Sequence, residues 1–133
     1  MEKKEFIIIS GGTSEIGESI IRELIPHFNI IFTYAKSKIK ADRIINKYKK
    51  IDNLIINKRL NLFSEKSINV FSKYLLSKNF YIRGFIHNAW EKVSRQDFVK
   101  IKKEILASKA LAIMNENKIT SYVLLAILIR IRQ

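Results

Sequence analysis

The chain has 133 residues, of which 47% are hydrophobic, and it contains no cysteine. This length predicts a single domain, residues 1–133, with a sizeable core, and the hydrophobic fraction is typical of a globular chain. The lack of cysteine excludes disulfides, thiolate metal sites and cysteine nucleophiles. The longest apolar stretch, Tyr122–Ile129, is far shorter than the ~20 residues of a membrane span. We therefore expect a cytoplasmic protein without membrane contact.

The charge is strongly basic, with 25 Lys and Arg against 12 Asp and Glu and a formal net charge of +13. Such a balance can indicate a nucleic-acid partner. The lysines are spread evenly, however, and no dense basic run or aromatic–basic motif of an RNA-binding sheet occurs. The pattern favours a solvated basic surface over nucleic-acid binding. With two histidines and no cysteine, we expect no metal site.

Hydrophobic periodicity divides the chain into alternating strands and helices. A helix capped by Ser64 carries Ile68, Phe71, Leu75 and Leu76 on its apolar face and Tyr74 on its polar side. Strands that alternate with helices of 10–15 residues predict βαβ units and a parallel sheet of the α/β class. The other predicted elements are strands at Phe6–Ser10, Asn29–Tyr34, Leu54–Ile56 and Phe80–His87, and helices at Ser14–Ile25, Lys38–Lys50, Asp97–Leu111 and Asn117–Arg132.

Residues 10–17 read Ser-Gly-Gly-Thr-Ser-Glu-Ile-Gly, between the first predicted strand and the first helix. Glycine lets the backbone approach a pyrophosphate closely, and the free N–H groups of the following helix attract the anion. A lone glycine pattern is weak evidence, but this one has a strand before it and a helix after it. It predicts a phosphate-binding turn.

This order of elements and turns resembles the short-chain dehydrogenase/reductase family of nicotinamide-dependent Rossmann enzymes, in its N-terminal half. The glycine turn stands where the family has Thr-Gly-x-x-x-Gly-x-Gly, and Thr33–Ser37 closes the second strand as in some members. Asn61-Leu62 stands where the family has an Asp and an apolar residue that hold the adenine. Phe85–Ala89 is similar to Asn-Asn-Ala-Gly at the end of strand four. Asn117, with Tyr122 and Leu124, is similar to the Asn-x-x-Gly-x-Phe that opens the long central helix.

The resemblance implies a Rossmann-type parallel sheet of about four strands in the order 3-2-1-4, with helices on both faces. It implies binding of NADP(H) rather than NAD(H), because Lys36 and Ser37 suit an adenosine 2′-phosphate and no acid ends the strand. Asn117 is the candidate catalytic residue, although an asparagine there also suits a helix cap. The implied cofactor-binding residues are Ser10, Gly11, Gly12, Thr13, Ser14, Glu15, Ile16, Gly17, Tyr34, Lys36, Ser37, Asn61, Leu62, Asn88 and Ala89.

Several features depart from the family pattern. Glu15 replaces the middle glycine of the turn, where its carboxylate either faces the phosphates or points to solvent. The family's serine and its Tyr-x-x-x-Lys have no counterpart, and Tyr34-x-x-x-Lys38 and Tyr74-x-x-x-Lys78 fit the spacing by coincidence. His87 replaces the first asparagine of the strand-four motif and reads as a packed, hydrogen-bonded residue.

The resemblance implies an NADP(H)-dependent short-chain oxidoreductase of the carbonyl or β-ketoacyl reductase type, with a small-molecule carbonyl substrate. The chain is expected to be truncated before the catalytic Tyr and Lys and inactive alone. Two alternatives remain open: a non-catalytic nucleotide-binding relic or interaction module, and one half of a split enzyme. We also expect self-association, because strand Phe80–His87 would lie at a sheet edge.

Overall fold

The computed structural model describes residues 5–78, 80–89 and 122–124 of the chain. All strand pairs in these residues are parallel, and the sheet order is β3-β2-β1-β4-β5. The predicted α/β class and the order 3-2-1-4 of the first four strands are confirmed. The elements are β1 (Glu5–Ser10), α1 (Glu15–Leu24), β2 (Asn29–Tyr34), α2 (Lys38–Tyr48), β3 (Ile55–Arg59), α3 (Glu65–Lys78), β4 (Tyr81–His87) and β5 (Tyr122–Leu124).

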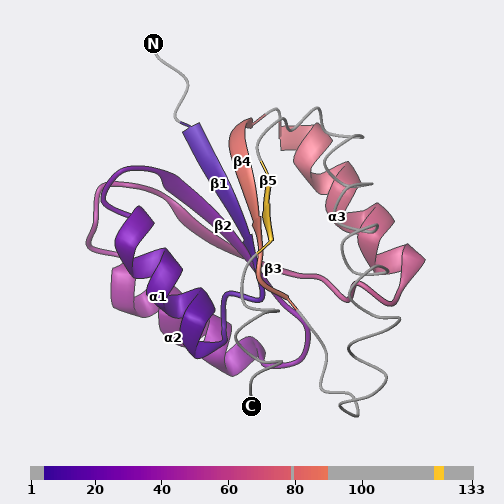
Figure 1. Ribbon diagram of the computed structural model, residues 1–133, viewed down its shortest axis with the longest axis horizontal. Coiled ribbons are helices and arrows are strands. Elements are labelled where there is room, and N and C mark those ends of the chain that lie inside the picture. The colour runs from indigo at the N-terminus through magenta and orange to yellow at the C-terminus, as the bar shows by residue number, and fades with distance from the viewer. Residues whose placement is uncertain (1–4, 79, 90–121, 125–133) are drawn as a thin grey trace.

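The sheet separates two helical layers, with α1 and α2 on one face and α3 on the other (Figure 1). Side chains alternate between the faces of a strand, so β1 contributes to two cores. Phe6 and Ile8 pack in the core that includes Phe71 of α3. Ile7 and Ile9 pack in the other core, which includes Ile21 of α1. The continuous apolar run of β1 is therefore explained by burial on both faces, as is typical of a central parallel strand.

Each described helix begins at a serine that caps it. The Oγ atoms of Ser14, Ser37 and Ser64 accept hydrogen bonds from backbone N–H groups of Gly17, Lys40 and Ser67, respectively. Such caps satisfy N–H groups that have no partner inside the helix. The predicted cap at Ser64 is confirmed. No helix in the described part of the chain is long and apolar enough to cross a membrane.

Three predictions about β3 and α3 were wrong in detail. β3 extends to Arg59 instead of ending at Ile56, because the polar residues Asn57 and Lys58 still pair with Phe32 and Thr33 of β2. On α3, Leu76 is 54% exposed rather than inward. Tyr74 packs at the edge of the core, with its ring 6.1 Å from that of Phe80 and 4.0 Å from Lys58 Nζ. The helix thus turns its apolar face slightly away from the predicted direction.

The largest correction concerns residues 122–124, which were predicted to lie in a long helix. They form β5, which pairs with β4 in parallel through Phe85–Tyr122, Ile86–Val123 and His87–Leu124. The end of β4 is therefore not a sheet edge, and this argument for self-association no longer holds there. Self-association itself stays a prediction. The predicted helix at 97–111, and the rest of 117–132, lie outside the described residues.

We predict that Phe71→Ala lowers the free energy of unfolding by about 3–5 kcal/mol, because it leaves a cavity in the core between α3 and the sheet. Phe71 is 2% exposed, whereas its neighbour Val70 is 60% exposed. Val70→Ala is therefore the matched control, with an expected change within about 0.5 kcal/mol. Urea denaturation of both variants measures the difference, and equal losses would contradict the described packing of α3.

Candidate functional site: a cavity at the glycine turn

The glycine turn between β1 and α1 packs directly on the end of β4. Gly11 has φ of +69°, a conformation that residues with a side chain rarely adopt. A Cβ at Gly11 would also lie 2.8 Å from Ala89 Cα. At Gly17 a Cβ would overlap the carbonyl oxygen of Gly11 and lie 2.9 Å from Asn88 Nδ2. Both positions therefore need glycine for the turn, α1 and the end of β4 to meet.

Ser14 and Asn88 join the turn to β4 by hydrogen bonds. Asn88 Nδ2 donates to the Gly11 carbonyl and to Ser14 Oγ, each at 2.9 Å. Ser14 Oγ donates to the same carbonyl at 3.1 Å and accepts from Gly17 N at 3.0 Å. The hydroxyl group thus uses its one donor and both of its acceptor positions. These hydrogen bonds fix the start of α1 relative to β4, although Ser14 and Asn88 lie more than 70 residues apart in the sequence.

Ser10 makes a second connection, which also determines the state of His87. The backbone N–H groups of Asn88 and Ala89 both donate to Ser10 Oγ at 3.0 Å. The Ser10 hydroxyl hydrogen is therefore free to donate to His87 Nδ1, 2.8 Å away. His87 is accordingly the neutral imidazole, with Nδ1 as acceptor and the proton on Nε2. Burial lowers its pKa to about 4, because the charged form loses its hydration. The interpretation of His87 as a packed, hydrogen-bonded residue is confirmed.

A cavity of about 430 Å³ opens beside this turn. It brings together many of the predicted binding residues, from the turn, from the loop after β2, from the loop after β3 and from the end of β4. These are Gly11, Thr13, Ser14, Lys36, Ser37, Asn61, Leu62, Asn88 and Ala89. The carboxyl ends of parallel strands meet at one edge of the sheet, and this edge is where such folds bind ligands.

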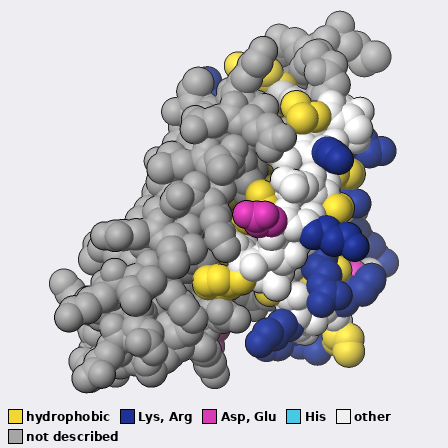
Figure 2. Space-filling view, turned by 90° about the vertical axis from the view of Figure 1, so that its right-hand side faces the viewer, with side chains coloured by type: hydrophobic (Ala, Val, Ile, Leu, Met, Phe, Trp, Pro, Cys, Tyr) yellow, Lys and Arg dark blue, Asp and Glu magenta, His cyan; other side chains and the backbone are white. Residues whose placement is uncertain are grey.

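The lining of this cavity carries a positive charge. Lys36, Lys40 and Arg59 line it, and none of its described lining residues is an Asp or a Glu. The N-terminus of α2, capped by Ser37, adds the positive end of a helix dipole. Figure 2 shows that Lys and Arg also gather along the described surface on the α3 side, with isolated acidic side chains among them. The cavity therefore suits an anionic ligand.

The other predicted site residues do not line the cavity. Ser10, Gly12 and Gly17 are buried, Ile16 is half-buried, and Tyr34 is buried at the end of β2. Glu15 is exposed at the first position of α1, where an acid stabilises the helix dipole. Asn117 lies outside the described residues. Among residues 5–78, 80–89 and 122–124, no group of acidic or histidine side chains could hold a metal ion.

Sequence reasoning missed six lining residues: Thr33, Ala35, Lys40, Arg59, Leu60 and Phe63. Thr33 Oγ1 accepts from Gly11 N at 3.3 Å, and its carbonyl accepts from Gly12 N at 2.9 Å, so it ties the turn to β2. The predicted strand Leu54–Ile56 ends three residues before Arg59, so that prediction does not place this cation at the end of β3. Extending the strand to the last residue before Leu60 would have placed this cation at the binding edge.

The residues present fit a nucleotide with phosphate groups. The backbone N–H groups of Glu15 and Ile16 make no hydrogen bond to any described residue, as expected of an anion-binding helix start. Asn88 is 2% exposed and its Oδ1 atom has no hydrogen-bond partner in the described part of the chain. Its amide cannot be reversed, because Nδ2 donates to the Gly11 carbonyl. Asn88 thus keeps a buried acceptor for a ligand or water at the edge of the cavity.

The chain has the fold of short-chain dehydrogenases/reductases. It superposes on a short-chain type dehydrogenase/reductase from Mycobacterium ulcerans with a TM-score of 0.67 at 10% identity, covering 86% of this chain and 46% of that one. For a double variant of a Serratia marcescens short-chain dehydrogenase/reductase the TM-score is 0.70 at 14% identity, with 87% and 50% covered. For a variant of actinorhodin polyketide ketoreductase with NADPH it is 0.70 at 14% identity, with 92% and 53% covered.

The chain spans about half the length of the dehydrogenase/reductase structures that it matches. No family model and no curated protein sequence matches it. The resemblance seen in the sequence is thus confirmed at the level of the fold. The sequence motifs had not revealed β5.

We predict that the free energy of unfolding falls as the pH drops from about 6.5 to about 4, because of His87. Its pKa is lowered in the folded state, so in this range the unfolded chain binds a proton that the folded chain does not. The loss reaches about 3 kcal/mol at pH 4. His87→Asn keeps an acceptor for the Ser10 hydroxyl and removes this pH dependence.

Denaturant titrations between pH 4 and pH 7 measure the effect. His27→Asn, at an exposed position, is the control and should follow the parent chain. If His87→Asn keeps the full pH dependence, the assignment of a neutral, buried imidazole is wrong.

Proposed function

We propose that this chain binds NADP(H) in the cavity at the glycine turn, as the dinucleotide-binding part of an oxidoreductase of carbonyl compounds. The single observation that carries the proposal is the convergence of the glycine turn, three cations and Asn88 on one cavity. The short-chain dehydrogenase/reductase fold supports it, and one structure of similar fold is a ketoreductase described with NADPH. When bound, the nicotinamide supplies or accepts a hydride.

Each end of the cavity has a role in this proposal. The turn, through Thr13 and the first residues of α1, holds the pyrophosphate by backbone N–H groups. Lys36, Lys40 and Arg59 hold the adenosine 2′-phosphate, which NADP(H) has and NAD(H) lacks. Ser37 Oγ already accepts from Lys40 N as the cap of α2, so its hydroxyl hydrogen is left to donate to the same phosphate. Asn61 and Leu62 lie beside the base.

Discrimination between the two cofactors tests the proposal. NADPH should bind about 10-fold tighter than NADH or better, because charge-assisted hydrogen bonds to the extra phosphate exceed neutral ones. Lys36→Ala combined with Arg59→Ala should bring the two dissociation constants close together. Nicotinamide fluorescence measures both titrations.

Lys66→Ala combined with Lys73→Ala removes the same charge from α3 and is the control. Because the three cations are exposed, the preference for NADPH should also weaken at high salt. Equal affinities for NADPH and NADH in the parent chain would overturn the NADP(H) assignment.

We further propose that these 133 residues alone do not turn over a carbonyl substrate. Reduction of a carbonyl requires a proton donor for its oxygen, usually a Tyr, His, Asp, Glu or Lys side chain. The described residues that line the cavity include no Tyr, His, Asp or Glu, and the proposal places Lys36 and Lys40 at the 2′-phosphate. Tyr34 is buried at the end of β2, and Tyr74 packs against Phe80 on α3.

An assay with NADPH and a panel of ketones and β-ketoacyl thioesters should therefore show no multiple turnovers. Steady turnover that is lost in Tyr34→Phe or Tyr74→Phe would show that one of these phenols acts as the donor. It would contradict their interpretation as structural residues.

A further inference from the structure

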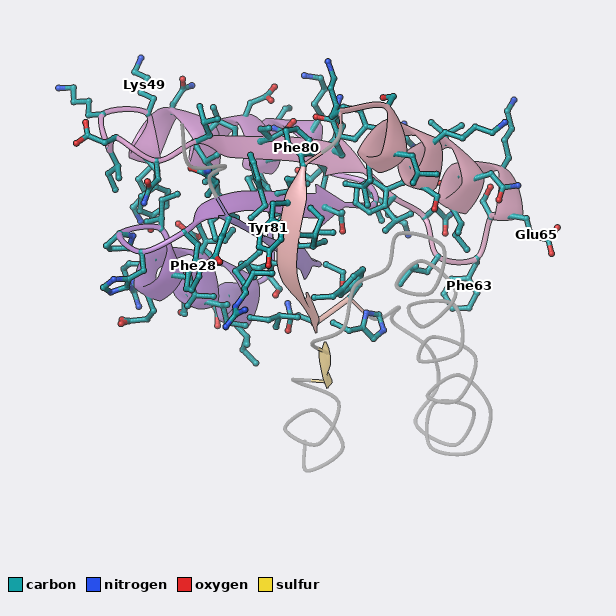
Figure 3. All side chains as sticks on the ribbon, turned by 90° about the horizontal axis from the view of Figure 1, so that it is seen from above. Phe28, Lys49, Phe63, Glu65, Phe80 and Tyr81 are labelled. Carbon is teal, nitrogen blue, oxygen red and sulfur yellow. The ribbon has the colours of Figure 1, made fainter. Side chains whose placement is uncertain are left out.

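β3 is the last strand of the sheet, and no strand in the described part of the chain pairs with its outer edge. Figure 3 shows β4 and β5 towards the lower end of the sheet, and the β3 edge is at the opposite end of the strand order. The register between β2 and β3 is continuous, so β3 has no bulge, and it contains no proline. Bulges and prolines commonly protect sheet edges. Within the described residues, the outer edge of β3 is therefore available for pairing.

The backbone groups on this outer edge follow from the hydrogen bonds that β3 makes to β2. The Leu54 carbonyl accepts from a residue near the start of β2, and Leu60 N donates to the last residue of β2, each at 2.9 Å. Successive residues of a strand direct their N–H and C=O groups to alternate sides, so even-numbered residues face β2. The residues that face outward are Ile55, Asn57 and Arg59. Their N–H and C=O groups make no hydrogen bond to any described residue.

Two polar side chains of β3 are bound to the helices on either face of the sheet. Asn57 Nδ2 donates to Asp42 Oδ1 of α2 at 3.1 Å. Lys58 Nζ lies 4.0 Å from the centre of the Tyr74 ring of α3. These contacts hold the two side chains over the faces of the sheet rather than across its edge. They leave the outward backbone groups accessible to another extended chain.

The side chains of β3 also indicate the chemistry of a partner strand. The first half of the strand is apolar, with Ile55 and Ile56 half-buried, and the second half carries the cations Lys58 and Arg59. Asp42, the acid that contacts β3, is already paired with a lysine of α2. The net charge of +13 opposes pairing with a second copy of this chain. An extended segment with apolar and acidic residues is complementary to this edge.

We propose that the outer edge of β3 binds an extended, acidic segment of a partner protein by strand addition. The segment forms main-chain hydrogen bonds with the outward groups of β3. Its apolar side chains lie beside Ile55 and Ile56, and its acids lie beside Lys58 and Arg59. An antiparallel arrangement is slightly more stable per residue, and it places the acids at the N-terminal end of the segment. The inference is independent of the proposed function, because it rests on the backbone of β3 and not on the cavity.

The probe is the fluorescein-labelled peptide acetyl-Glu-Glu-Thr-Val-Val-Val-amide, titrated with the full chain and followed by fluorescence anisotropy. We expect saturable binding. Replacing both glutamates by lysines should weaken it at least about 10-fold, because opposite charges across a strand pair attract and like charges repel. N-methylation of the threonine should abolish binding, because opposite Asn57 its N–H points to β3. N-methylation of the next valine, whose N–H points away, should change the dissociation constant by less than about 3-fold.

Asn57→Pro tests the same edge by changing the chain itself. It removes the outward N–H without removing a hydrogen bond to β2, and binding should weaken at least about 10-fold. Asn57→Ala is the matched control, because both variants lose the bond to Asp42 but only Ala keeps the N–H. It should bind the peptide like the parent chain. A thermal melt checks folding, and if the proline variant does not fold, the two N-methylated peptides decide on the parent chain.

Absence of saturable binding, equal binding of the glutamate and lysine peptides, or equal effects of the two N-methylations overturns the inference. Dimerisation of the peptide-free parent chain that is lost in Asn57→Pro, measured by sedimentation, would assign the edge to a second copy and also overturn it. A single-stranded RNA that displaces the peptide and binds the parent and Asn57→Pro equally would do the same. That result would show a surface that binds polyanions in general.

Discussion

The close approach of the glycine turn to the end of β4 is the constraint on which the rest of the structure depends. Gly17 leaves room for the Gly11 carbonyl, and that carbonyl accepts hydrogen bonds from Ser14 and Asn88. Removing one partner of such a partly buried network leaves polar groups unsatisfied, which costs more than the bond itself contributes. The network therefore fixes the start of α1 relative to the sheet. It also fixes the side of the cavity that the glycine turn lines.

The polar groups of the site fall into two regions, one neutral and one positively charged. Near β4, neutral groups dominate: the Ser10 hydroxyl, the neutral His87 and the Asn88 amide, all buried. Towards β3, the cations Lys36, Lys40 and Arg59 are exposed at the cavity rim. This division is physically reasonable, because buried charges without partners are costly whereas exposed ones keep their hydration. A ligand in this cavity would meet neutral groups at the β4 end and cations at the β3 end.

The sequence was sufficient for the features that depend on local pattern. The strand–turn–helix unit, the boundaries of β2 and the serine cap of α3 follow from periodicity and capping chemistry. The sequence did not predict the features that depend on pairing between strands distant in the chain. Asn57 and Lys58 have low strand propensity, yet they pair with β2. Residues 122–124 belong to an apolar run that fits helix and strand patterns equally well. They form a strand because they pair with β4. The orientation of the Asn61 amide likewise depends on Phe63 N, which no pattern of residue types reveals.

Binding an anion and transferring a proton make different demands on the residues of such a site. Binding an anion needs donors and cations, and the cavity has backbone N–H groups, hydroxyls, amides and three cations. Proton transfer at neutral pH needs a group whose pKa lies near 7. His87 is the buried residue whose intrinsic pKa is closest, but burial holds it near 4 and Ser10 occupies its Nδ1 atom. The hydrogen bond to Ser10 thus joins this neutral, buried histidine to the end of β1, where the turn begins.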